Sequence, residues 1–230
     1  EIHNLFYSEK TEFEGIFSHY SNADGEDDDY DDYQTANFNR LVELFKFKPK
    51  YIHIDNSAGV IKYSDRDDIC NLSRIGIALY GCYPSSNIEK LNKLSLEPVV
   101  SLVSKVTHVK KILKGTKVGY GISYEALEDE YIATIPIGYA DGLLRRAQGF
   151  KVKVGSEECE IVGRVCMDQL MVRCSENTKV GDDVVFFGEY NDQKVLIDDF
   201  AAYQNTISYE VFCCINKRVP RKYYINNMEL

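Results

Sequence analysis

Short apolar runs alternate with amphipathic segments between residues 13 and 82. The apolar runs predict strands at 16–20, 51–55 and 74–81, and the third of these is expected to be largely buried. Because helical segments separate the strands, we expect the strands to be parallel, either in an open sheet or in a closed (β/α)₈ barrel.

Spacing and end signals define the helical segments. Apolar side chains between Tyr33 and Phe47 fall on one helix face, and Pro49 ends this helix. A short helix is expected to begin within residues 56–59. Three strand–helix units cannot close a barrel, so the other five, at about 30 residues each, would precede Glu1. Residues 1–7 resemble the middle of an amphipathic helix, and we therefore expect a fragment of a longer protein.

The pattern changes after Pro84, where short alternating strands and turn residues replace the strand–helix order. This pattern predicts an all-β domain of sandwich or barrel type. We place the boundary near residue 90, so residues 1–90 form the last three or so β/α units of a TIM-type barrel and residues 91–230 form the β domain. The expected strands of the β domain lie at 99–109, 131–137, 151–154, 160–165, 170–173 and 183–187.

Composition and charge narrow the class of protein. Hydrophobic residues make up 44% of the chain and charged residues 27%, which is ordinary globular usage. A net charge of −9 argues against nucleic-acid binding as the main function. No apolar run is long enough to cross a bilayer, and no export signal precedes the first strand. We expect a soluble, cytoplasmic protein.

Neither the cysteines nor the acidic run predicts a metal site. The seven cysteines lack C-x-x-C spacing, and most lie in apolar runs where a thiol packs as a small hydrophobe in a reducing compartment. The acidic residues 25–32 lack EF-hand spacing. They precede a helix, where carboxylates suit the helix dipole, and are interpreted as a solvated helix entrance.

Polar residues cluster at the expected strand ends. His19 follows the first strand, Asn56 and Ser57 follow the second, and Arg74 begins the third. Strand ends and the loops after them build the active site of a β/α barrel. A hydroxyl and N–H groups near Ser57 suit a phosphate, and Gly76 permits close backbone approach. Taken singly, helix capping and ion pairing explain these residues better.

Three segments with glycines or polar residues also interrupt the β pattern, at 118–124, 136–142 and 163–169. Polar residues that break a regular pattern indicate a site. The segments "GIFSHYSNAD", "HIDNSAG", "SRIGIALYG", "KVGYGISY", "TIPIGYADGLLRR", "IVGRVCMDQLMV" and "TISYEV…RVPR" occur in the order and at the spacing seen in alanine racemases. The chain therefore resembles the C-terminal part of an alanine racemase from residue 13 to residue 221.

The resemblance implies a barrel that binds pyridoxal phosphate and a β domain that closes the partner's active site in a head-to-tail homodimer. It implies interconversion of L- and D-alanine, for the supply of D-alanine to the cell wall. Two bases on opposite faces of the substrate Cα would transfer the proton on the cofactor aldimine.

Residue roles follow from the matching positions. Tyr120 would be one base, supported by His19, and Arg74 would face the pyridine nitrogen, which stays uncharged because a guanidinium gives up no proton. The residues expected at the cofactor phosphate are Asn56, Ser57, Gly76, Ile77 and Tyr209. Those expected at the substrate are Cys166, Met167 (through its backbone N–H), Asp168 and Tyr139. Those expected at the substrate entrance are Asp24, Arg145 and Arg164, together with Tyr139; a surface ion pair also explains Arg145.

The Schiff-base lysine of the family, in the motif Lys-Ala-Asn-Ala-Tyr-Gly, does not occur in these 230 residues, nor does the barrel arginine that supports the tyrosine. We therefore expect this chain alone to be inactive, although the whole protein would be an isomerase.

Other interpretations remain. A serine racemase of the same family is one, although Tyr209 favours alanine. A basic amino-acid decarboxylase shares the architecture, but "GRVCMDQ" argues against it. A non-catalytic interaction fragment that retains the racemase surface would bind neither the cofactor nor an N-terminal fragment.

Overall fold

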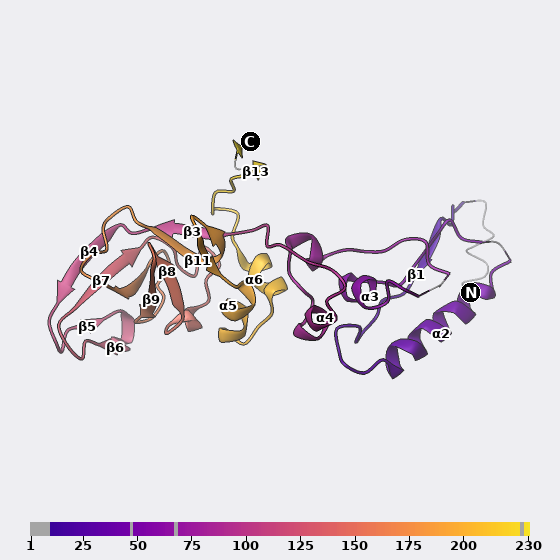
Figure 1. Cartoon of the computed structure of the whole chain (residues 1–230), viewed down its shortest axis with the longest axis horizontal. Coiled ribbons are helices and arrows are strands. Elements are labelled where there is room, and N and C mark those ends of the chain that lie inside the picture. The colour runs from indigo at the N-terminus through magenta and orange to yellow at the C-terminus, as the bar shows by residue number, and fades with distance from the viewer. Residues whose placement is uncertain (1–9, 47, 67–68, 226–227) are drawn as a thin grey trace. The chain divides into compact units, whose positions relative to one another are not determined.

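The computed structural model describes residues 10–46, 48–66, 69–225 and 228–230. It contains two compact units, Glu1–Glu97 and Pro98–Leu230 (Figure 1). The division lies beside Pro98, whereas the sequence placed it near residue 90. The helix expected over residues 1–7 lies outside the described residues. Among the described residues, every helix is too short or too polar to cross a bilayer.

The first unit contains the predicted alternation of strands and helices. Strand β1 (Gly15–Phe17) pairs in parallel with β2 (Tyr51–His53), and Ile16 lies opposite Ile52. The two strands are shorter than expected. Helix α2 (Asp29–Glu43) connects them, α3 (Ser57–Lys62) follows β2, and α4 (Ser86–Lys90) lies near the end of the unit.

The prediction of a strand at residues 74–81 is wrong. Residues 71–76 have no regular structure, and Ile77–Tyr80 form a 3₁₀ turn. The segment runs beside β2, but side chains replace the backbone ladder: Asn71 Oδ1 accepts from the Ile52 N–H (2.9 Å), and Ser57 Oγ accepts from the Gly76 N–H (2.9 Å). Only isolated backbone bonds remain, such as Arg74 N–H to Asp55 O (3.1 Å).

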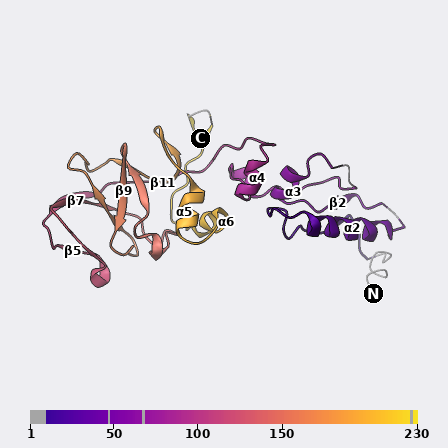
Figure 2. The same ribbon diagram turned by 60° about the horizontal axis from the view of Figure 1, so that its bottom comes forward.

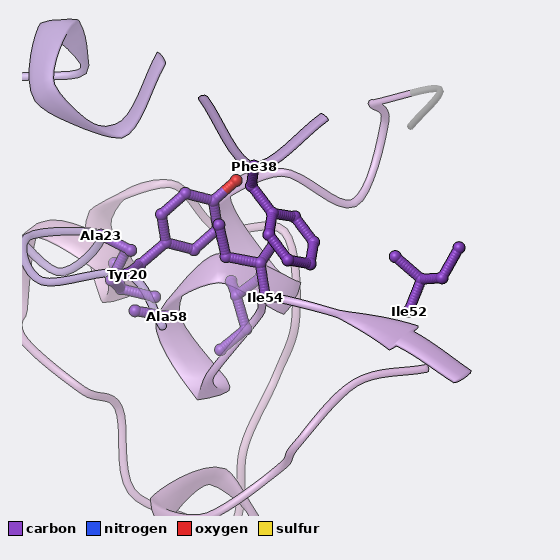
Figure 3. Close-up of a cluster of buried hydrophobic side chains, with 8 residues drawn as sticks. Tyr20, Ala23, Phe38, Ile52, Ile54 and Ala58 are labelled. Carbon is purple, nitrogen blue, oxygen red and sulfur yellow. The ribbon is translucent and has the colours of Figure 1, made fainter. Parts of the chain in front are cut away.

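Aromatic and aliphatic side chains from the loops, strands and helices form the core of the first unit. Figure 3 shows Tyr20, from the loop after β1, beside Phe38 of α2 and Ile54. All three are buried. This packing holds the loop after β1 against β2, and both segments carry candidate site residues.

The acidic run is not only a solvated helix entrance. Asp31 is fully buried, and its Oδ2 accepts from the Tyr63 hydroxyl (2.6 Å). Lys62 Nζ lies 2.5 Å from Asp28 and 3.6 Å from Asp31. The hydrogen bond from Lys62 lowers the pKa of Asp28, whereas burial and Asp31 raise the pKa of Tyr63, which therefore remains a donor. These contacts connect α2 to α3.

The second unit is an antiparallel sheet with two packed helices. Its strands lie in the order β12-β11-β8-β9-β10-β7-β4, and β3 pairs with β11. Figure 2 shows α5 and α6 beside β11, so the expected all-β domain also contains helices. The elements of this unit are β3 (Leu102–Lys105), β4 (His108–Ile112), β5 (Lys117–Val118), β6 (Tyr124–Glu125), β7 (Glu130–Ile135), β8 (Lys151–Val154), β9 (Glu157–Val162), β10 (Leu170–Cys174), β11 (Asp183–Tyr190), β12 (Gln193–Val195), α5 (Ile197–Tyr203), α6 (Ser208–Cys214), β13 (Tyr224–Ile225) and β14 (Met228–Glu229).

Several predicted strands of this unit have different bounds, and two of the differences have a clear physical cause. The expected strand 99–109 is two strands, because the Val106 N–H bonds to Asp182 O and the Thr107 N–H bonds to Thr134 O, so the chain changes partner there. The strand expected at 160–165 begins earlier and ends at Val162, because Gly163 has a φ of +69°.

The sheet core predicts a stability effect. Leu170 on β10 has no solvent exposure, so Leu170→Ala would remove apolar contacts and leave a cavity. We expect the free energy of unfolding to fall by about 2–5 kcal/mol, measured by urea unfolding followed by far-ultraviolet circular dichroism. Val180→Ala, at a site that is 66% exposed, should change it by less than about 0.5 kcal/mol. Equal effects of the two variants would contradict the assigned core.

Candidate functional site

Arg74 and two histidines form the polar centre of the first unit. Arg74 Nη2 donates to His19 Nδ1 (2.9 Å), and Arg74 Nη1 donates to His53 Nδ1. Nη2 also donates to the carbonyl oxygens of Ser18 (2.7 Å) and Ile54 (3.2 Å). The guanidinium therefore joins the ends of β1 and β2. Among the described residues, Arg74 Nε has no hydrogen-bond partner.

The arginine determines which nitrogen of His19 carries the proton. A guanidinium only donates, so His19 Nδ1 accepts and the neutral ring carries its proton on Nε2. Asn56 Nδ2 lies 3.4 Å from Nε2, but the Asn56 oxygen accepts from the Gly59 N–H (3.0 Å), which turns the amide nitrogen toward the ring. Two donors face each other, so the Nε2 proton remains available to another acceptor.

His53 was not identified as a candidate from the sequence. Its ring stacks on Phe17, with 5.4 Å between ring centroids. Burial, with a smaller contribution from the Arg74 charge, lowers the pKa of His53, which favours the neutral ring that accepts from Arg74. A polar residue inside the short apolar strand β2 was the only available signal.

Ser57, Gly76 and Ile77 form a second cluster. Ser57 is buried, and its hydroxyl oxygen accepts from the backbone N–H groups of Gly76 (2.9 Å) and Ala78 (3.4 Å). A Cβ on Gly76 would meet only the Ser57 hydroxyl, at 3.8 Å, so space is open there. Within the described part of the chain, the Ile77 N–H has no acceptor. A hydroxyl beside backbone N–H groups suits an oxyanion.

Tyr120 lies on an exposed loop of the second unit. It is 72% exposed and stands between Gly119 (φ +78°) and Gly121 (φ +70°). The glycines let this loop contact the segment after β9. A Cβ on Gly119 would lie 3.2 Å from the backbone nitrogen of Arg164, and a Cβ on Gly121 would lie 2.7 Å from Arg164 Nη1. Arg164 thus packs against the tyrosine loop.

The loop after β7 lies against the turn before β10. Tyr139 N–H donates to Cys166 O (3.0 Å), and Ala140 N–H donates to Met167 O (3.0 Å). A Cβ on Gly138 would overlap these carbonyl oxygens, so glycine is required for this approach. Met167 is 53% exposed, and its backbone N–H has no acceptor among the described residues.

Arg218 was not identified as a candidate from the sequence, and Asp141 was included only as part of the segment 136–142. Arg218 Nε donates to Asp141 Oδ1 (2.7 Å), and its Nη2 donates to Asp168 Oδ1 (2.7 Å). The other Asp141 oxygen accepts from the Gly138 N–H (2.8 Å). A local sequence pattern cannot predict the contact between Arg218 and Asp141, because the two residues are 77 positions apart.

The remaining candidates lie outside these clusters. In the first unit, the Asp24 carbonyl accepts from the Ser85 hydroxyl (2.6 Å). In the second unit, Arg145 begins the 3₁₀ turn Arg145–Ala147, and Tyr209 is a half-exposed residue of α6.

The two clusters of the first unit follow strand–helix elements, and a separate β domain follows them. A strand–helix unit followed by a β unit is the domain order of proteins that combine a β/α barrel with a β domain. Residues 2–84 match the family model "Alanine racemase, N-terminal domain", and residues 99–223 match "Alanine racemase, C-terminal domain". The chain belongs to the alanine racemase family.

Individual relatives agree with this assignment. The alanine racemase of Ligilactobacillus salivarius (strain UCC118) is 45% identical over 217 residues, which cover 94% of this chain and 58% of the relative. The alanine racemase structure of Bacillus anthracis with bound L-Ala-P has a TM-score of 0.90 and 38% identity, covering 95% of this chain and 57% of that one. The structure of the alanine racemase of Clostridium difficile 630 in complex with cycloserine has a TM-score of 0.91 and 38% identity, covering 100% of this chain and 61% of that one. The chain therefore spans a little over half the length of these relatives.

His53 predicts a pH dependence of stability. Its pKa in the folded state lies below the usual 6.5, so the unfolded chain binds this proton more tightly. The resulting stability is present above about pH 6.5 and is lost as the pH falls through the folded-state pKa. We expect the fall in unfolding free energy between pH 7.5 and pH 5, two values about one pH unit or more on either side of the usual histidine pKa, to be smaller in His53→Gln, measured by urea unfolding. The control is His108→Gln, at an exposed residue of β4. If this fall in His53→Gln is as large as in the natural chain, the lowered pKa of His53 is contradicted.

Proposed function

We propose that this chain provides part of the cofactor site and the β domain of an alanine racemase that interconverts L- and D-alanine. The observation that carries this proposal is the Arg74–His19 hydrogen bond beside the oxyanion cluster of Ser57, Gly76 and Ile77. One end of this region has the Ser57 hydroxyl and the Ile77 N–H, which has no acceptor among the described residues, and the other end has the guanidinium of Arg74 as a donor.

The residues fit pyridoxal phosphate. Ser57 and the Gly76 and Ile77 amides would hold its phosphate, with Asn56 beside them and Tyr209 as a further contact. The Arg74 Nε–H, which has no partner in the described chain, would face the ring nitrogen without protonating it. When bound, the cofactor withdraws electrons from the substrate Cα, so that a weak base is sufficient.

Tyr120 would hold or accept the proton on one face of the substrate. A phenol ordinarily keeps its proton at neutral pH, since its reference pKa is about 10. The His19 Nε2–H would donate to the phenolate oxygen and stabilise it. Arg74 sets this tautomer, so both residues support the tyrosine. In a head-to-tail homodimer, His19 and Tyr120 would come from different protomers.

The substrate carboxylate would accept from the Met167 N–H, which Cys166 and Asp168 flank. Tyr139 and Arg164 would narrow the approach, with Asp24 and Arg145 farther out. A narrow entrance with polar side chains suits a small zwitterion. The relatives described above are named for alanine, which favours alanine over serine.

The second base would be the lysine of the Lys-Ala-Asn-Ala-Tyr-Gly motif, which these 230 residues do not contain. The activity therefore concerns the whole protein. No disulfide bond joins the cysteines of the described residues, which supports a reducing compartment such as the cytoplasm.

Tyr120→Phe in the full-length protein tests this function. Removing one of two bases should lower racemisation about 10²- to 10⁴-fold, whereas exchange of the Cα proton with solvent should persist for one alanine enantiomer only. The measurement is deuterium incorporation into L- and D-alanine by mass spectrometry. Tyr33→Phe, at an exposed residue of α2, is the control. Equal loss of exchange from both enantiomers, with cofactor still bound, would contradict the role of Tyr120.

A further inference from the structure

Three segments of the second unit meet at Asp141. They are the loop after β7 (residues 138–142), the turn before β10 (residues 166–169) and the segment after α6 (residues 215–221). The Asp141 side chain is only 13% exposed. One carboxylate oxygen closes its own loop at the Gly138 N–H, and the other accepts from Arg218.

Arg218 connects this loop to the turn before β10. Its Nε and Nη2 each donate at 2.7 Å, to Asp141 and Asp168 respectively. The two N–H groups of a guanidinium have a fixed geometry, so two carboxylates that bind them are held at a fixed separation. Lysine, with one rotating ammonium, cannot impose this geometry.

Backbone contacts transmit the constraint to Met167. The carbonyl oxygens of Cys166 and Met167 accept from the Tyr139 and Ala140 N–H groups, and the Cys166 N–H donates to Gln169 O (2.9 Å). The peptide groups on both sides of Met167 are therefore held in place by their carbonyl oxygens, and the N–H of the first of them, that of Met167, has no acceptor among the described residues.

The position of Arg218 is itself defined. The backbone N–H of Arg218 donates to Asn216 Oδ1 (3.0 Å), and the backbone N–H of Asn216 donates to the backbone oxygen of Asp141 (2.9 Å). Arg221 donates to the carbonyl oxygens of Ile215 (3.0 Å) and Asn216 (2.7 Å). The segment after α6 is thus a built support for Arg218, although the Arg218 side chain is 45% exposed.

We infer that Arg218 is a positioning residue that, through Asp141 and Asp168, orients the Met167 N–H and the Tyr139 loop for the carboxylate of a small amino acid. This inference rests on the proposed function, because Met167 is assigned to the substrate there. Arg218 itself is not a catalytic residue.

The test compares Arg218→Ala, Arg218→Lys and Arg173→Ala in the full-length protein. Arg173 is a matched control: it is also about half exposed and donates to one carboxylate, Glu160 (2.8 Å), away from the loops. Hydrogen–deuterium exchange at the Tyr139 and Ala140 amides reports the loop, and amides of β8 and β9 are the internal reference. Kinetics with alanine report the site.

In Arg218→Ala we expect these amides to exchange about five- to thirtyfold faster, as the loss of one to two net hydrogen bonds predicts. We expect KM for alanine to rise by up to about 10²-fold, the effect of a small misplacement, with a smaller change in kcat. Arg218→Lys should lie between the alanine variant and the natural protein, and Arg173→Ala should change neither quantity.

An unchanged rate of amide exchange in Arg218→Ala would overturn the inference. The same holds if Arg218→Lys has the exchange rates and the KM of the natural protein. Faster exchange with an unchanged KM would reject the role toward substrate. If the natural protein itself does not racemise alanine, the proposed function fails, and the exchange data then decide separately whether Arg218 holds the loops. Should Arg218→Ala not fold, Asp168→Ala removes the acceptor for Arg218 Nη2, which is one half of the bridge, at a side chain that is 62% exposed.

Discussion

The first unit depends on one chemical constraint, the inability of the Arg74 guanidinium to accept a hydrogen bond. Because it only donates, both His19 and His53 must offer an unprotonated Nδ1 to it. The same side chain binds carbonyl oxygens after β1 and after β2, so the two strand ends and the two imidazoles share one fixed centre. The tautomers of both imidazoles are thus determined by a side chain that donates hydrogen bonds and accepts none.

In the second unit, the close approach of backbone segments is what fixes the candidate loops relative to one another. Gly138 lies where a Cβ would overlap the Cys166 carbonyl, and Gly119 and Gly121 lie against Gly163 and Arg164. These contacts bring loops from β7, β9 and the tyrosine segment together without large side chains between them. Backbone contact is rigid but carries little sequence information, and the Arg218 bridge adds a directional constraint to it.

Periodicity predicted elements correctly where strands pair regularly, as at β8, whose bounds Lys151–Val154 match the expected ones. It failed at 74–81, because the Asn71 and Ser57 side chains take the hydrogen bonds that a strand would form. In the site, the sequence indicated His19, Ser57 and Arg74 because they follow or precede apolar runs, and the structure brings them onto neighbouring segments. Arg218 gave no such signal, since its carboxylate partners lie 50 and 77 positions away.

The two arginines show why similar side chains serve different purposes. Arg74 uses both terminal nitrogens on protein groups, and its Nε–H has no partner among the described residues, whereas Arg218 Nε donates to Asp141. The partners differ accordingly. Among the described residues no carboxylate pairs with Arg74, which suits the anionic cofactor proposed for this region, while two carboxylates more than neutralise Arg218. Charge balance around each guanidinium therefore separates the arginine that we propose faces a ligand from the one that we propose holds loops in place.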